Sequence, residues 1–194
     1  MTDPRYPESA ACHEAGHVVV AAAQGLRLSR HGIHLDADGR GISYYQYRKP
    51  KRFSAQPSEI SREHTIIATL AGLIAQQKFY PDCSVCGASD DQSFIDMLTK
   101  EIEEEDDFIG TAVLRAQLDL PREATRLVEL HWLAIDAVAR ALWDSPITPR
   151  NFHEPEPQWS ESKMEKWLPG ARIVEILRRF GIEASIWDET ILAD

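Results

Sequence analysis

Residues 7–24 constrain the fold of this chain more than any other segment. Half of these residues are Ala or Val, and Gly25 follows them as a helix stop signal. A helix that is apolar on nearly every side is normally buried in a protein core. This one nevertheless contains His13, Glu14 and His17 near its middle. The sequence therefore predicts a largely buried helix whose polar cluster needs a partner, because an unpaired buried cluster would be costly.

Residues 13–17 read His-Glu-Ala-Gly-His, an H-E-x-x-H pattern. Residues four apart on a helix share one face, with Cβ atoms about 5–6 Å apart, so both imidazoles can reach one tetrahedral zinc. Glu14 projects toward the open coordination position, where it can take a proton from zinc-bound water. The pattern predicts Zn²⁺ as cofactor, His13 and His17 as ligands and Glu14 as the catalytic base. The alternative is a pair of helix histidines without a metal.

A catalytic zinc normally has three protein ligands and a water, so a third ligand is expected. His31 and His34 are candidates, but their odd spacing in a predicted strand places them on opposite faces of the sheet. Three further histidines show no local pattern, and surface or core packing explains them better: His64, His131 and His153.

Two other parts of the chain also offer a third ligand. Cys83 and Cys86 form a C-x-x-C pair, which is a weak signal by itself. Asp90 and Asp91 open a predicted helix, where the helix dipole favours carboxylates whether or not a metal is bound. The residues alone leave the choice between these candidates open.

The remaining pattern predicts an α+β fold, mostly helical with one small sheet. Strand-like stretches at 32–35 and 41–45 flank a turn at 36–39. Longer helical patterns follow at 57–81, 89–105 and 121–143. Prolines then punctuate the chain, which leaves room for short helices near 161–167 and 171–179. We expect a domain over residues 1–145 and a helical tail over 146–194 packed across it.

Net charge bears on the kind of partner this chain binds, and cysteine content bears on the compartment in which it works. The net charge is −10, which argues against nucleic acid or an anionic membrane as the main partner, although six negative charges are concentrated in residues 101–107. The longest apolar run is far shorter than the ~20 residues of a membrane span, and no secretory signal is evident. Three cysteines are too few for a disulfide framework, so we expect a cytoplasmic protein.

Two motifs together resemble the peptidase domain of the FtsH-type ATP-dependent zinc proteases. Residues 12–18 read Cys-His-Glu-Ala-Gly-His-Val, and residues 87–91 read Gly-Ala-Ser-Asp-Asp. In that family the second motif resembles Gly-Ala-Ser-Asn-Asp and its final Asp binds zinc. The resemblance thus implies that Asp91 is the third ligand and that Asp90 stands at the family's usual Asn. It covers roughly residues 5–145 and is strong only at these two motifs.

Two intervening segments are also similar to this family, and several features depart from it. Residues 32–45 look like its strand pair beside the active site, and residues 69–77 look like its Leu-Gly-Gly-Arg-Ala-Ala-Glu-Glu helix. In that helix Gly72-Leu73 replaces the second glycine, and Gln76-Gln77 replaces the acidic pair. The sequence contains no G-x-x-x-x-G-K-[ST] loop and no membrane anchor, and residues after 145 have no counterpart.

These observations lead us to expect a zinc metalloendopeptidase that hydrolyses unfolded or flexible polypeptides without ATP. The resemblance implies that the strand nearest the metal binds an extended substrate by main-chain hydrogen bonds, and the candidate residues are Gly41, Ile42 and Ser43. Two alternatives stay open: a catalytically silent binding or regulatory module, and a peptidase subunit that works with a separately encoded ATPase. Homo-oligomerisation also stays open.

Overall fold

The computed structural model describes residues 6–36, 39–47, 49, 60–82, 89–105, 119–149 and 164–187. Within these residues the chain is a mixed α+β protein with six helices and one small sheet, which confirms the expected class. The helices are α1 (Tyr6–Ala23), α2 (Arg62–Phe79), α3 (Ser89–Glu105), α5 (Leu120–Leu130), α6 (Trp132–Trp143) and α7 (Gly170–Arg178). The strands are β1 (Leu28–Asp36), β2 (Gly41–Tyr45), β3 (Ile147–Pro149), β4 (Met164–Leu168) and β5 (Ile186–Trp187).

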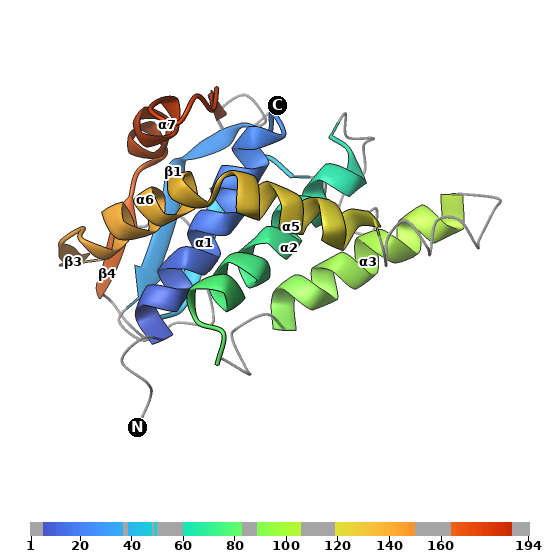
Figure 1. Cartoon of the computed structure of the whole chain (residues 1–194), viewed down its shortest axis with the longest axis horizontal. Coiled ribbons are helices and arrows are strands. Elements are labelled where there is room, and N and C mark those ends of the chain that lie inside the picture. The colour runs from blue at the N-terminus through green and yellow to red at the C-terminus, as the bar shows by residue number, and fades with distance from the viewer. Residues whose placement is uncertain are drawn as a thin grey trace.

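Helix α1 is the centre of the molecule, and its burial is what its composition predicts. It is buried from Ser9 to Ala22 and contacts α2, α6, β1 and β2. In Figure 1, α5 and α6 cross in front of α1 and α2, and the sheet lies on the other side of α1. The polar residues of α1 are therefore enclosed by other elements and held in place by them.

A very close crossing joins α1 to α2. A Cβ atom added at Gly16 would lie 2.6 Å from the carbonyl oxygen of Ala71 and 2.8 Å from the Cβ of Ala75. Small residues at this crossing let the two backbones approach each other. The approach brings side chains and carbonyls of α2 within hydrogen-bonding distance of the histidines of α1.

The sheet combines strands from both ends of the chain. Its order is β2-β1-β4-β3 with antiparallel neighbours, and β5 pairs with β1 in parallel. The short helix expected near 161–167 is wrong for its described part, because residues 164–168 form β4 and pair with β1. The helix expected at 171–179 is confirmed as α7. The described part of 146–194 thus contributes the strand next to β1, so it is integrated into the sheet.

The single helix expected at 121–143 is wrong, because the chain bends at His131 between α5 and α6. The φ of −106° and ψ of 17° at His131 lie outside the helical region. The bend directs the two apolar faces at different partners: α5 packs on α2, whereas α6 packs on α1 and α7. Periodicity alone predicts a continuous helix here, since the hydrophobic spacing persists across the bend.

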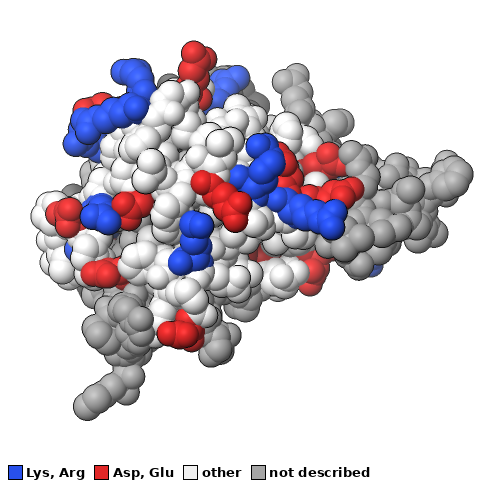
Figure 2. Space-filling model, in the orientation of Figure 1, with Lys and Arg blue, Asp and Glu red and all other residues white. Residues whose placement is uncertain are grey.

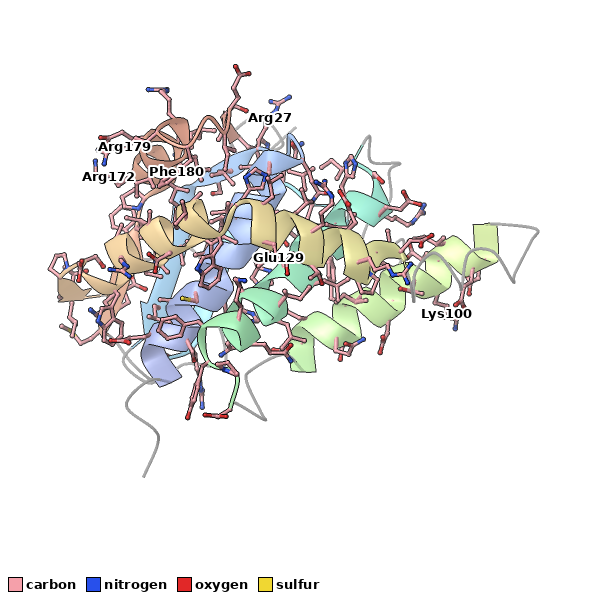
Figure 3. The ribbon with its side chains drawn as sticks, viewed as in Figure 1. Arg27, Lys100, Glu129, Arg172, Arg179 and Phe180 are labelled. Atoms are coloured by element: carbon pink, nitrogen blue, oxygen red, sulfur yellow. The ribbon has the colours of Figure 1, made fainter. Side chains whose placement is uncertain are left out.

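Charged residues on the surface are distributed without a dominant sign on the face shown in Figure 2, where basic and acidic side chains alternate. Arg172 and Arg179 both pair with Glu175 on α7 and point into solvent at the edge of the molecule (Figure 3). Among the described residues, no helix has the length and apolar character needed to cross a membrane.

An irregularity at Gly32 changes the faces of β1. Between the pairs Leu28–Tyr45 and Ile33–Ser43, five steps along β1 correspond to only two along β2. Gly32 has a φ of +66°, a left-handed conformation that glycine adopts without strain. Successive side chains in this part of β1 therefore do not point strictly to opposite faces of the sheet.

The histidines of β1 consequently share one face, and their expected placement on opposite faces is wrong. Both rings lie with their centroids 5.8 Å from the ring of Tyr44. His34 also stacks on Trp167, and its Nδ1 lies 3.1 Å from a carboxylate oxygen of the buried Glu165. His31 and His34 thus belong to a cluster on the sheet that is separate from His13 and His17.

We predict that Gly32→Ala destabilises the protein much more than Gly25→Ala. Gly25 has a φ of +81° with no atom within 4 Å of an added Cβ, so only left-handed strain of about 1–2 kcal/mol is expected. An added Cβ at Gly32 would also overlap the carbonyl of Leu168, so the loss should exceed about 3 kcal/mol. Urea unfolding of both variants measures the difference. Equal losses would show that the close approach of β1 to β4 is not tight.

Candidate metal centre

Three side chains from α1 and α3 converge on one point. The Nε2 atoms of His13 and His17 are 2.9 Å apart, and Oδ2 of Asp91 lies 2.9 Å from the first and 3.3 Å from the second. Ligands that are each about 2.0–2.1 Å from a tetrahedral zinc lie roughly 3.3 Å from one another. The three atoms therefore have nearly the spacing that a shared zinc ion requires.

Hydrogen bonds on the far side of each ring fix where the imidazole protons lie. Nδ1 of His17 donates to the carbonyl oxygen of Ala68 at 2.9 Å, and Nδ1 of His13 donates to Oε1 of Gln76 at 3.1 Å. In the neutral form of each ring, a proton on Nδ1 leaves Nε2 with a lone pair directed at the cluster. Such partners of ligand histidines are typical of metal sites.

The cluster fits a cation because it gathers acceptors without enough donors. When both imidazoles are neutral, the buried Oδ2 of Asp91 faces two lone pairs and has no hydrogen-bond donor among the described residues. Two imidazole nitrogens and one carboxylate oxygen form a donor set that zinc accepts. These residues could therefore hold the ion and leave a fourth position for water or substrate.

Asp91 reaches the cluster from the first turn of α3, where a carboxylate is favoured by the helix dipole. Its side chain is 27% exposed, and Oδ2 points at the histidines. Asp90 is fully on the exposed side of α3, although it also borders the pocket. Of the two carboxylates, the structure brings Asp91 to the histidines; metal binding itself stays a prediction.

Room for His17 depends on Gly72 in α2. A Cβ atom added at Gly72 would overlap the imidazole ring of His17. The carbonyl of Ala68 and the face of Gly72 together position this ring from one helix. Tyr45 stacks on its other side, with ring centroids 6.4 Å apart.

Glu14 lies beside the cluster against strand β2. It is only 7% exposed, and a Cβ added at Gly41 would overlap its carboxylate. The Ser43 hydroxyl donates a hydrogen bond to this carboxylate. Two of the three residues predicted to bind substrate therefore contact the predicted base directly.

A pocket of about 650 Å³ contains the whole arrangement. His13, Glu14, His17 and Asp91 all line it. It is also lined by residues of β2, of the chain next to β2 and of α3: Arg40, Gly41, Ile42, Ser43, Tyr45, Tyr47 and Phe94. The predicted substrate strand thus borders the same space as the predicted metal ligands.

Burial and the neighbouring charges shift the ionisation of these groups. Burial lowers the pKa of His17, but the Asp91 carboxylate outweighs it and the net pKa is raised to about 9. Burial raises the pKa of Asp91, yet the adjacent histidines hold it well below its usual range. Burial raises the pKa of Glu14 despite the opposing effect of the two histidines. Without a metal, a proton on His17 therefore balances the charge of Asp91.

Among the described residues, the other candidate histidines lie elsewhere. Cys83 and Cys86 fall outside the described residues, as does His153. His64 is exposed on α2, and His131 lies at the bend between α5 and α6. Burial raises the pKa of the Cys12 thiol to about 12, which keeps it neutral.

Sequence reasoning missed the residues that support the histidines. Gln76 and Gly72 were noted only as departures from a family helix, and nothing local in the sequence signals that the Ala68 carbonyl accepts from His17. The i, i+4 and i+8 spacing of Ala68, Gly72 and Gln76 on α2 was the available signal, because it places all three on one helix face.

A comparison with protein-family models and with curated proteins finds no match for this chain.

We predict that zinc binds more tightly as the pH rises from 6.5 toward 9. The pKa of His17 is raised by folding, so its proton stabilises the metal-free protein below about pH 6.5 and this stabilisation is lost as the pH rises to about 9. Zinc has to displace that proton, so its apparent affinity should rise up to about tenfold per pH unit. Melting temperatures with and without buffered zinc at pH 6.5, 7.5 and 8.5 should diverge. A constant difference would contradict the assignment of the proton.

Proposed function

We propose that this chain is a zinc metalloendopeptidase similar to the FtsH-type peptidase domain, and that it acts without ATP on unfolded or flexible polypeptides. The observation that carries the proposal is the convergence of His13 Nε2, His17 Nε2 and Asp91 Oδ2 within 3.3 Å beside a buried glutamate. The same three residues follow from the two motifs on which the family resemblance rests.

A bound zinc would supply a Lewis acid that polarises the scissile carbonyl and acidifies the attacking water. The chain's own residues do the rest. Glu14 takes the proton of the attacking water and passes it to the leaving amine. Gly41 and Ser43 hold its carboxylate in place, and burial keeps its pKa above that of an exposed glutamate, which suits a group that must accept and return a proton.

Strand β2 offers a backbone surface for an extended substrate. It lies at the edge of the sheet in the described part of the chain. The amide of Asp36 donates to the carbonyl of Arg40 at 2.8 Å, so this is a hydrogen-bonded pair of the antiparallel ladder. Because such pairs alternate, the N–H and C=O groups of Gly41 and Ser43 point away from β1. Gly41 and Ser43 line the pocket, and we propose that a peptide adds there as a further strand.

The choice of substrate follows from what the sequence lacks. Without a P-loop, this chain cannot hydrolyse ATP in the P-loop manner, so the proposed substrates are ones that need no unfolding. Recognition through the backbone of β2 would be broad, with preferences set by pockets for alternate side chains. A silent binding module is the second candidate, but the buried and well-positioned Glu14 favours an enzyme.

We predict that Glu14→Gln retains zinc but loses peptidase activity by at least about 100-fold, because the amide cannot accept the proton. Metal content and digestion of casein by the two proteins measure this. His17→Ala is the matched control and should lose both zinc and activity. Equal turnover by Glu14→Gln and wild type would assign Glu14 another role and favour the silent module.

We predict that Ser43→Pro reduces peptide turnover much more than it reduces stability. Proline removes the N–H group that points to the free edge of β2 and leaves the ladder with β1 intact. Ser43→Ala is the control, since it keeps this N–H and loses only the hydrogen bond to Glu14. Turnover and melting temperature are compared for both variants. Equal turnover in the two folded variants would exclude β2 as the substrate strand.

A further inference from the structure

Gln76 lies between the metal centre and the start of α1. It is 2% exposed and belongs to α2. Its Oε1 accepts the hydrogen bond from Nδ1 of His13, and its Nε2 donates to Oγ of Ser9 at 3.3 Å. Ser9 is itself fully buried. In this arrangement Ser9 accepts from the N–H end of the amide, and the carbonyl end faces His13.

The direction of this amide decides which nitrogen of His13 carries the proton. If the amide were reversed, its N–H group would point at Nδ1 and the ring proton would move to Nε2. That proton would then lie between His13, His17 and Asp91, where the metal has to bind. The observed direction leaves Nε2 of His13 with a lone pair for the metal.

We propose that Gln76 is a positioning residue: it holds His13 in the metal-binding tautomer while adding no charge to the centre. The inference rests on the proposed zinc site. The acceptor for His17 is likewise neutral, because it is the carbonyl of Ala68. Among the described residues, Asp91 is therefore the ionised group in contact with the two Nε2 atoms.

A carboxylate at position 76 would act differently from the amide. It would accept the same hydrogen bond from His13 but more strongly, and it would make the imidazole a more basic ligand. The neutral amide thus gives the centre a lower metal affinity than the same fold could reach. In exchange, the bound metal keeps more of its Lewis acidity, since less negative charge surrounds it.

Four variants of the full chain test this inference by zinc affinity, measured in competition with a chromogenic chelator. Gln76→Leu removes the acceptor and should weaken zinc binding by about 10- to 100-fold. Gln76→Glu keeps the acceptor and should bind zinc as tightly as wild type or more tightly. Ser9→Ala releases the amide and should weaken binding by a smaller factor. Gln77→Glu, on the exposed side of α2, adds the same charge and should change affinity less than twofold.

The outcomes separate this inference from the proposed function. A loss in Gln76→Leu together with retention in Gln76→Glu supports it, because a merely structural role would weaken both variants. Unchanged affinity in Gln76→Leu, or equal losses in both, would overturn the inference while leaving the zinc site intact. A wild-type protein that binds no zinc would overturn the proposed function as well.

If Gln76→Leu does not fold, the zinc affinities of Gln76→Glu and Ser9→Ala are compared instead. Weaker zinc binding by Gln76→Glu than by Ser9→Ala overturns the inference, and the reverse order supports it.

Discussion

The close crossing of α1 and α2 is the contact on which the candidate site depends. Gly16 lets the two helices approach, and the approach places Ala68 and Gln76 behind the two histidines. Each ring is then held by a hydrogen bond from its Nδ1, so that both Nε2 atoms face Asp91 at the start of α3. A helix as apolar as α1 can bury these polar groups because every ring has a partner on its far side. The same crossing leaves β2 on the open side of the pocket, next to Glu14.

Local patterns predicted much of this arrangement. The helical spacing of His13 and His17 follows from the sequence alone, and so do the boundaries of α3 and β2, since their turn and cap signals are strong. Asp91 could be chosen over Asp90 only through the family resemblance, because the helix dipole favours both positions equally. The structure brings Asp91 to the histidines, and its role as a ligand stays a prediction.

The failures of sequence reasoning have a common physical cause, which is long-range packing. Gly32 breaks the alternation of β1 where it meets Leu168, and this puts His31 and His34 on one face. The bend at His131 exists because α5 and α6 cover different helices. Residues 164–168 look weakly helical in isolation and become a strand because β1 offers them an edge. No window of local sequence contains those partners.

Metal content of the purified protein is the most direct test of the central claim. We expect about one zinc per wild-type chain, with an anomalous scattering peak at the zinc edge between His13, His17 and Asp91. Exchange for cobalt should give a spectrum without a thiolate band, because all three ligands are nitrogen or oxygen. Protein that contains no zinc after reconstitution, or a peak elsewhere in the molecule, would contradict the proposed zinc site.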